Sequence, residues 1–397
     1  MANFANNGNH SQPTGVMLES GKPLRVLVAA PSLDILGGQS RQAVRLIDGL
    51  KLESSLRVGF VPHNPRMPRG FGWLQRIKYV RTLATTLLYW LQLLTQIPRY
   101  DIVHIFSAAY YSYMLSAVPA ILIAKLFGKK SILNYRSGEA EDHLQNWKLT
   151  AVPIMRLADS IVVCSAYLVE VFARFGLPAR FVYDVVELDR FYYRERRPIR
   201  PVFLTSRLLE PLYNVPCVLR AFSLIQKQYP KATLKIAAEG FLRPELEQLA
   251  SDLDLKATRF VGRVAFEEMP ATYDGADIYL TATNLDNMPG SITESMACGL
   301  PVVTTNAGGI PYIVTHEETC LMIDCDDHEG MAAKAIRLLR DNDLAVSIGR
   351  RAREDARKFT WEVVRDEWLE VYFNLSAKPV TNSERGGFQD GPVNNAG

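Results

Sequence analysis

The chain has 397 residues, of which 48% are hydrophobic and 22% charged, and its formal net charge at pH 7 is +3. This length leaves room for two domains that each bury a core, and so small a net charge does not indicate a nucleic-acid-binding protein. The five cysteines are an odd number without metal-site spacing, so we expect a protein of the reducing cytoplasm.

Both ends of the chain lack hydrophobic periodicity. Residues 1–22 are rich in Asn, Gly and Ser, and residues 378–397 have Gly-Gly, Pro and Asn in place of apolar spacing. Such segments cannot bury enough apolar surface to fold, so we predict disordered tails. The first tail also lacks the charged start and continuous apolar block of an export signal.

Short β-branched runs alternate with longer segments of helical spacing from Leu24 onward, which is typical of parallel strands joined by crossover helices. The pair Gly37-Gly38 follows the first run and opens a helix, where bare backbone amides could approach a phosphate or a sugar. A strand-to-helix turn also uses glycine for conformational reasons alone, and both explanations stay open. In this half of the chain we expect strands at residues 24–30, 57–62, 101–107, 130–136, 160–165 and 180–186.

The segment 66–97 combines basic and aromatic residues with an uncharged apolar end. Its last 16 residues, TLATTLLYWLQLLTQI, are fewer than the roughly 20 that a helix needs to span a bilayer. We expect a peripheral membrane contact in which the basic turn meets anionic lipid and the aromatic rings lie at the interface. An ordinary helix buried against the first sheet is the alternative, and the two can coexist.

The charged, proline-containing stretch 194–201 (RERRPIRP) separates this half of the chain from a second one. We therefore predict an α/β protein with two Rossmann-like, doubly wound domains, at residues 23–193 and 194–360, and a ligand in the cleft at the carboxyl ends of their strands. A last helix, residues 361–377, is expected to cross back to the first domain. The strands expected in the second domain are 202–206, 233–238, 259–263, 277–283, 301–305 and 320–324.

The most informative motif is TNLDNMPGSITESMACGLPVVTTNAGGIPYIV, residues 283–314. Asp286 follows an expected strand, and Glu294 lies on the first turns of the next helix. A carboxylate can accept both hydroxyls of a ribose, although an acid near a helix N-terminus is also favourable by itself. Free amides at the start of this helix suit a phosphate. The amides expected there are those of Gly290, Ser291 and Ile292.

Arg207 ends the expected strand 202–206 and should therefore point into the same cleft. A guanidinium at this place could pair with a diphosphate. A solvated arginine at a strand end is the alternative.

The pattern D-x7-E-x-M-A-C-G-x-P-V-V, followed by G-G-I-P-x-I-V, resembles the donor site of family-4 retaining glycosyltransferases of the GT-B fold. The likeness extends from Arg25 to about Leu375. The resemblance implies that Asp286 binds the transferred sugar, Glu294 the nucleotide ribose and Arg207 the diphosphate. It also implies that the pair Gly37-Gly38 faces the donor and the acceptor.

The sequence departs from the family pattern at three places. The first acid is Asp286 where the family usually has glutamate, Leu212 and Tyr213 stand where it has a lysine, and Arg136 stands where it has a histidine near the reacting carbon. Arg136 could replace the lysine electrostatically, because a departing diphosphate must be neutralised.

Two further residues close to Arg136, Glu139 and His143, are candidates for binding the acceptor. Either of them could instead be an exposed polar residue of a mobile loop.

These features predict a retaining glycosyltransferase that moves a hexose-type sugar from a nucleoside diphosphate to an acceptor hydroxyl, in polysaccharide or glycolipid biosynthesis. Asp286 and Arg136 would be the catalytic residues. We expect no metal and no cofactor besides the donor, because the histidines lack paired spacing and no D-x-D clamp is evident. The acceptor would be a saccharide or lipid-linked, at the inner face of the membrane.

Two rivals remain open. One is a non-catalytic GT-B homologue that binds a nucleotide or a partner enzyme, which the missing lysine and histidine motivate. The other is an epimerase acting on a sugar nucleotide.

Overall fold

The computed structural model describes residues 22–33, 37–67 and 78–376. The two predicted tails, apart from Lys22, therefore lie outside the described residues, as do residues 68–77 of the segment 66–97.

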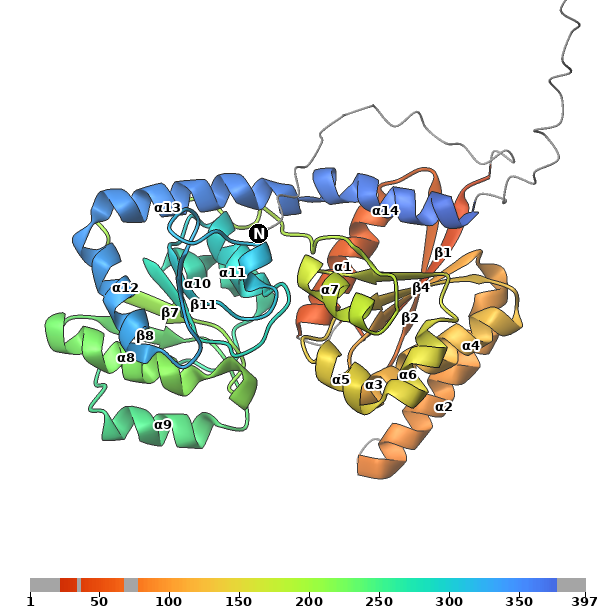
Figure 1. Ribbon diagram of the computed structural model, residues 1–397, viewed down its shortest axis with the longest axis horizontal. Coiled ribbons are helices and arrows are strands. Elements are labelled where there is room, and N and C mark those ends of the chain that lie inside the picture. The colour runs from red at the N-terminus through yellow and green to blue at the C-terminus, as the bar shows by residue number, and fades with distance from the viewer. Residues whose placement is uncertain (1–21, 34–36, 68–77, 377–397) are drawn as a thin grey trace, which may run out of the picture.

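Two parallel six-stranded sheets follow one another along the chain (Figure 1). The first contains β1 (Leu24–Ala30), β2 (Leu56–Pro62), β3 (Ile102–Ser107), β4 (Lys130–Tyr135), β5 (Ser160–Val163) and β6 (Arg180–Phe181). The second contains β7 (Val202–Thr205), β8 (Thr233–Ile236), β9 (Thr258–Phe260), β10 (Ile278–Thr281), β11 (Val302–Thr305) and β12 (Leu321–Ile323).

Both sheets are doubly wound, as the alternation of strand and helix signals predicted. The strand orders are β2-β1-β3-β4-β5-β6 and β12-β11-β10-β7-β8-β9, so the order reverses at β1/β3 in the first sheet and at β7/β10 in the second. Ligands of such sheets bind beyond the carboxyl ends of the strands at this reversal. The candidate site should therefore lie after β1 and β3 on one side and after β7 and β10 on the other.

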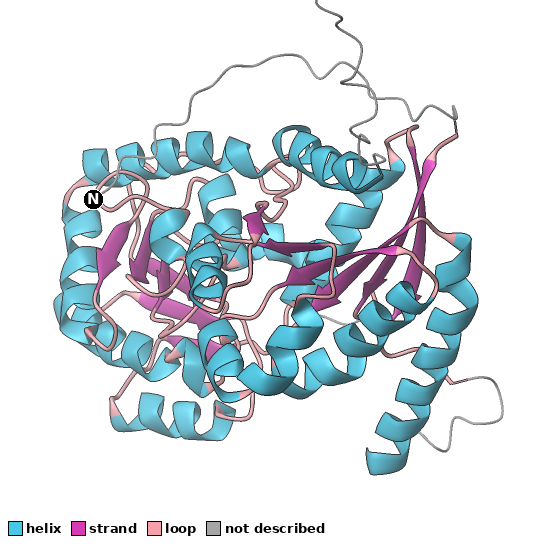
Figure 2. Cartoon of the chain, turned by 45° about the vertical axis from the view of Figure 1, so that its right-hand side comes forward, coloured by secondary structure: helices cyan, strands magenta, loops and turns pink. Residues whose placement is uncertain are grey.

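Helices cover the sheets (Figure 2). In the first domain they are α1 (Gly38–Lys51), α2 (Lys78–Gln96), α3 (Tyr110–Ser112), a π-helical turn (Tyr113–Ala117), α4 (Val118–Leu126), α5 (Ala140–Asn146), α6 (Lys148–Met155) and α7 (Ala166–Arg174). The helices that follow the first domain in the chain are α8 (Val215–Gln228), α9 (Arg243–Asp252), α10 (Met269–Asp274), α11 (Gly290–Ala297), α12 (His328–Arg340), α13 (Asn342–Asp355) and α14 (Trp361–Ser376). Short 3-10 turns are Ile97–Arg99, Pro211–Tyr213, Phe266–Glu268, Ile310–Tyr312 and Ala356–Phe359.

The strands are buried on both faces, which is why they read as continuous apolar runs in the sequence. In β1, Val26 and Val28 belong to one buried cluster and Leu27 to another. The cluster that contains Leu27 continues into the second domain, where it includes Tyr279 of β10 and Met296 of α11. The two domains thus share one continuous apolar core beneath the cleft.

The last helix, α14, packs on the first domain, in line with α13 along one edge of the molecule (Figure 1). Its Trp368 and Tyr372 are buried in the same cluster as Val26 and Val28. At Gly49 of α1 a Cβ atom would lie 2.4 Å from the ring of Trp361, so glycine is needed for α1 and α14 to approach this closely.

The strand expected at residues 180–186 is wrong beyond Phe181. Val182 still donates to the carbonyl of Val163, but the backbone N–H and C=O of Val185 bond to the side chain of Gln42 in α1 instead of to a neighbouring strand. Residues 182–186 are mostly apolar because they are buried. Burial alone does not make a segment a strand, so the apolar pattern was misleading here.

Candidate active site in the interdomain cleft

A cavity of about 950 Å³ lies between the two sheets, at the carboxyl ends of their strands. The first domain contributes the start of α1, the loop 136–139 after β4, and Asp184. The second contributes the loop after β7, the loop after β10, and the start of α11. The cavity therefore lies at the chain reversal of the second sheet. On the first sheet it lies beyond β1 and β4, and none of the described residues directly after β3 is in its lining. Its position at the carboxyl ends of the strands is where a doubly wound sheet binds its ligand, and its size suits a small molecule.

Helix α11 begins at Gly290, and its first two residues, Gly290 and Ser291, line the cavity. Pro289 before it has no N–H, and the amides at the first turn of a helix have no partner within the helix. The prediction for Ile292 is wrong, because its amide donates to the carbonyl of Pro289 at 3.0 Å and its side chain is fully buried. Two amides, not three, are presented to an anion.

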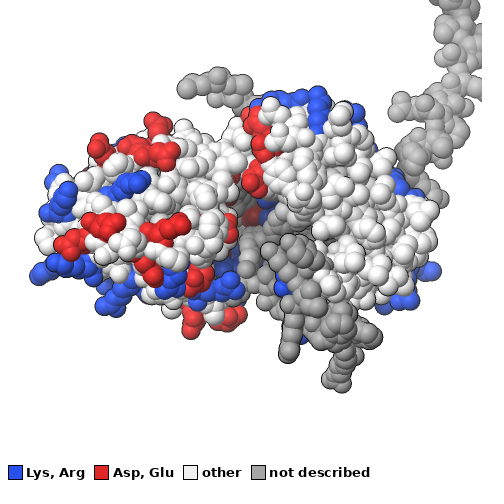
Figure 3. Space-filling model, turned by 90° about the horizontal axis from the view of Figure 1, so that it is seen from below, with Lys and Arg blue, Asp and Glu red and all other residues white. Residues whose placement is uncertain are grey.

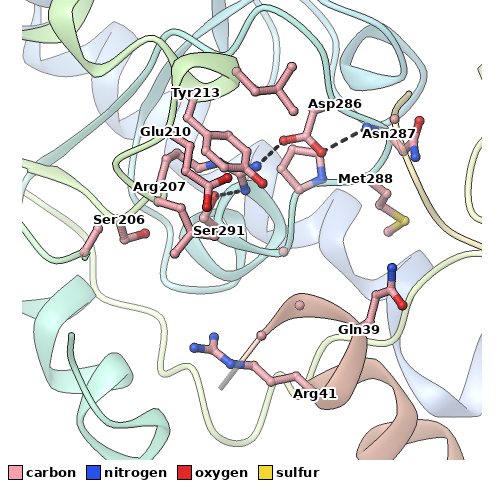
Figure 4. A pocket seen from close by; sticks show the side chains of 18 of the residues that line it. Gln39, Arg41, Ser206, Arg207, Glu210, Tyr213, Asp286, Asn287, Met288 and Ser291 are labelled. Carbon is pink, nitrogen blue, oxygen red and sulfur yellow. Dashed lines mark hydrogen bonds and ion pairs between the residues drawn. The ribbon is translucent and has the colours of Figure 1, made fainter. Parts of the chain in front are cut away.

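Arg207 and Asp286 form an ion pair at the edge of the cavity (Figure 4). Their side chains are 13% and 16% exposed. Burial is the largest effect and disfavours the charged guanidinium, but the Asp286 carboxylate and three neighbouring tyrosines together outweigh it and raise the pKa of Arg207. The guanidinium also lies 4.2 Å from the centre of the Tyr213 ring, a cation–π distance. The residues expected to bind the diphosphate and the sugar are thus each other's partners in this structure.

The Gly-Gly turn of the motif holds the Asp286 loop in place. Gly309 donates its N–H to the carbonyl of Asp286 at 2.7 Å. A Cβ on Gly308 would lie 2.3 Å from that carbonyl oxygen, and one on Gly309 would lie 2.1 Å from the carbonyl oxygen of Asn287. Two glycines are needed here because the loops after β10 and β11 touch backbone to backbone.

Glu294 is 2% exposed, and both of its carboxylate oxygens have partners. One oxygen accepts from Arg45 of α1 at 3.1 Å, and the other accepts from the hydroxyl of Tyr273 at 3.1 Å. Arg45 also donates to Glu187 at 2.9 Å and to the carbonyl of Val185 at 2.9 Å. The acid expected to bind the ribose is therefore part of a buried ion pair that joins the two domains.

Arg136 pairs with Asp184, and each side chain is 8% exposed. Burial raises the pKa of Asp184, and the guanidinium of Arg136 opposes this rise. The guanidinium lies 5.4 Å from the centre of the Phe106 ring. Arg136 does reach the cavity, but with its charge matched by a carboxylate.

The glycine pair Gly37-Gly38 lines the cavity beside Arg41. Within the described part of the chain, no atom beyond the neighbouring residues lies within 4 Å of where a Cβ would stand on either glycine. The space in front of them is therefore open to a ligand. The guanidinium of Arg41 lies 3.8 Å from Glu294, and Figure 4 shows Arg41 across the cavity from Arg207.

The two residues expected to bind the acceptor, Glu139 and His143, lie in different surroundings. Glu139 lines the cavity next to Gly138, which approaches the Asp286 loop. His143 is fully buried, its Nδ1 lies 2.9 Å from the hydroxyl of Tyr135, and burial lowers its pKa to about 4. His143 is therefore a core residue surrounded by aromatic rings, and the expectation that it faces the acceptor is wrong.

Sequence reasoning missed several residues of the site, among them Arg45, Asp184 and Arg263. Arg45 and Asp184 form the ion pairs described above, and Arg263, after β9, is an exposed cation in the cavity lining. For Arg45 a signal was present, since a charge occupies a position next to the buried Leu46 and Ile47 of α1. No comparable sequence signal distinguishes Asp184 or Arg263.

Two parallel, doubly wound domains with a ligand cavity between the carboxyl ends of their strands define the GT-B architecture. Residues 193–355, the second domain, match the family model of glycosyl transferases group 1. The structure of Anabaena HepE in complex with UDP-glucose has the same fold, with a TM-score of 0.70 at 16% identity over 88% of this chain and 100% of that one.

Two named bacterial glycosyltransferases are similar to parts of the chain. The D-inositol 3-phosphate glycosyltransferase of Corynebacterium jeikeium is 28% identical over 200 residues, which is 47% of this chain and 48% of the relative. The glycogen synthase of Mycobacterium tuberculosis is 28% identical over 284 residues, 66% of this chain and 67% of the relative. The chain thus spans about half the length of the first relative and two thirds of the second.

Proposed function

We propose that the protein is a retaining glycosyltransferase that moves a sugar from a nucleoside diphosphate to an acceptor hydroxyl. One observation carries the proposal, which is that Arg207, Asp286, Glu294 and the start of α11 converge on one cavity at the chain reversal of the second sheet. A diphosphate needs cations and amides, and a sugar nucleotide offers hydroxyls to carboxylates.

The diphosphate would bind to the amides of Gly290 and Ser291 and to Arg207. Its negative charge competes with Asp286 for the guanidinium, so donor binding would free the Asp286 carboxylate to accept hydroxyls of the sugar. The bond between the anomeric carbon and the diphosphate oxygen breaks, the acceptor oxygen takes its place on the same face, and the acceptor proton leaves with the diphosphate. Neutralising the departing charge is the main task of the protein in such a step.

The donor class rests on the resemblance of the motif and on the fold shared with a protein that was solved with UDP-glucose. We assign no cofactor besides the donor. The acceptor would be a saccharide or a lipid-linked molecule of polysaccharide or glycolipid biosynthesis, bound on the side of the cavity formed by Glu139 and used in the cytoplasm, at the inner face of the membrane.

Release of nucleoside diphosphate from a panel of UDP-, GDP- and ADP-sugars tests the proposal. We expect Glu294→Gln to abolish release, and Glu318→Ala, which changes an exposed glutamate outside the cavity, to leave it intact. Because Glu294 pairs with a buried arginine, the melting temperature of each variant must be measured alongside. A folded Glu294→Gln variant with normal release would refute the assignment.

A second candidate is a binding protein without catalysis. It is favoured by the observation that Arg45, Arg136 and Arg207 are each already paired with a carboxylate. A nucleotide would then raise the melting temperature while no sugar nucleotide in the panel is cleaved.

A further inference from the structure

Helix α2 carries an apolar row on the side turned away from the protein core. Leu83, Leu87, Leu91 and Leu94 are 74%, 56%, 52% and 41% exposed. Their spacing of three and four residues places them along one side of the helix. Single exposed leucines are ordinary on a protein surface, but a row of four over three turns is not.

The opposite side of α2 is an ordinary core face, which the sequence offered as the alternative for this segment. Tyr89 and Leu93 are 1% and 0% exposed and belong to the large buried cluster. The helix is therefore apolar on two sides, and packing against the domain accounts for one of them.

The apolar row continues onto the neighbouring elements. The indole N–H of Trp90, itself 40% exposed, donates to the carbonyl of Leu115 in the π-helical turn at 3.4 Å, and Leu115 is 40% exposed. The next helix, α4, adds Leu122 and Leu126, at 45% and 74%. Together these side chains form the α2 face, which consists of Leu83, Leu87, Trp90, Leu91, Leu94 and Leu115.

The chain around the α2 face is rich in basic residues, of which Lys125 and Lys130 pair with Asp159. Residues 54–138 contain eleven Lys and Arg and one acidic residue, Asp101. The carboxylate of Asp101 is taken up by Arg25, at 2.6 Å. Cations flank the α2 face in sequence. Arg81 at the start of α2 and Arg99 just after it have no carboxylate partner within the described ranges, and Lys129 after α4 interacts with Asp101 only through its charge.

The α2 face lies at one end of the molecule, where it is accessible to a partner. Helix α2 projects beyond the first domain, at the end opposite α14 (Figure 1). Seen from that end, charged side chains of both signs crowd the second domain, whereas few are visible on the first domain outside the area that grey atoms cover (Figure 3). A weakly charged apolar surface with basic residues around it and no acids of its own suits the headgroup and upper acyl region of an anionic bilayer.

We infer that the α2 face binds anionic phospholipid membranes, with its leucines in the interfacial layer and Arg81, Arg99 and Lys129 close to lipid phosphates. The contact is peripheral, because within the described residues no helix has the length and apolarity to cross a bilayer. It goes beyond the proposed transferase activity and does not depend on it. If both hold, the cavity works beside a membrane, where a lipid-linked acceptor would be found.

Co-sedimentation of the full chain with lipid vesicles tests the inference. We expect binding to vesicles of phosphatidylcholine with phosphatidylglycerol, weak binding to phosphatidylcholine alone, and loss of the difference at about 1 M salt, where the screening length is about 3 Å. Joint replacement of Leu83→Glu and Leu87→Glu should lower the partition coefficient by on the order of 100-fold. Arg81→Ser and Lys129→Ser should each lower it roughly fivefold.

The matched control is Val363→Glu, which places the same charge on a 50% exposed position of α14, at the opposite end of the molecule, and should leave vesicle binding unchanged. Donor cleavage without vesicles is measured in parallel, so failure of the transferase proposal and failure of this one are distinguishable. Equal sedimentation of the wild type and the double variant, or no sedimentation of either, would overturn the inference. So would a wild-type dimer that the double variant converts to a monomer, since the face would then bind a second copy of the chain.

Discussion

The ion pair between Arg207 and Asp286 leads to a prediction in which binding and turnover change in opposite directions. In Asp286→Asn the side chain keeps its shape and loses its charge, so Arg207 is left with no competing carboxylate. The free nucleoside diphosphate should then bind more tightly than to the wild type. Turnover of the sugar donor should fall by about 100- to 1000-fold, the usual cost of removing one positioned group that acts on the transition state.

The size of the binding gain follows from the geometry. Two opposite unit charges about 4 Å apart attract by about 4 kcal/mol at an effective dielectric constant of about 20. The two side chains are only 13% and 16% exposed, so solvent screens the pair weakly. Hydration regained by an unpaired guanidinium offsets much of the attraction, and we expect a net gain of about 1–2 kcal/mol, roughly tenfold in Kd.

Isothermal titration calorimetry with UDP, GDP and ADP measures this effect directly. Arg207→Met should lose most of the affinity, and Asp324→Asn, at an exposed aspartate outside the cavity lining, should change nothing. If Asp286→Asn binds the diphosphate more weakly than the wild type while its melting temperature is unchanged, Asp286 does not compete for Arg207 and the proposed exchange of partners is refuted.

Three further predictions concern stability and loop geometry. Arg45→Ala leaves the buried carboxylate of Glu294 without its main partner and should cost about 3–5 kcal/mol in urea unfolding, against about 1 kcal/mol or less for Arg197→Ala in an exposed pair. Burial lowers the pKa of His104 from 6.5 to about 3, so its contribution to stability is complete above pH 6.5 and is lost as the pH falls toward 3; acid unfolding of His104→Gln should lack this part of the pH dependence. Gly309→Ala puts a Cβ 2.1 Å from a backbone oxygen of the loop after β10, and donor cleavage should fall by at least about tenfold while circular dichroism shows a folded protein.

Local signals in the sequence were enough to predict both sheets. The runs at residues 24–30 and 130–136 became β1 and β4 within one residue, because strands buried on both faces must be apolar throughout. The run at 180–186 failed after Phe181, where side-chain bonds from α1 replace strand pairing. The placement of Asp286 and Gly290 beside the cavity followed from the rule that loops after parallel strands meet at one edge of a sheet.

The sequence by itself determined the two doubly wound domains and several of the residues that border the cleft, since strand periodicity, helix starts and Gly-Gly turns act over a few neighbouring positions. Only the tertiary structure decided which charges neutralise one another. Arg45 meets Glu294 across 249 positions of the chain, and Asp184 lies 48 positions from Arg136. Such pairs depend on how two domains close over a cavity, and no spacing along the chain records that geometry. The same reason hid the burial of His143, whose aromatic neighbours come from separate elements of the first domain.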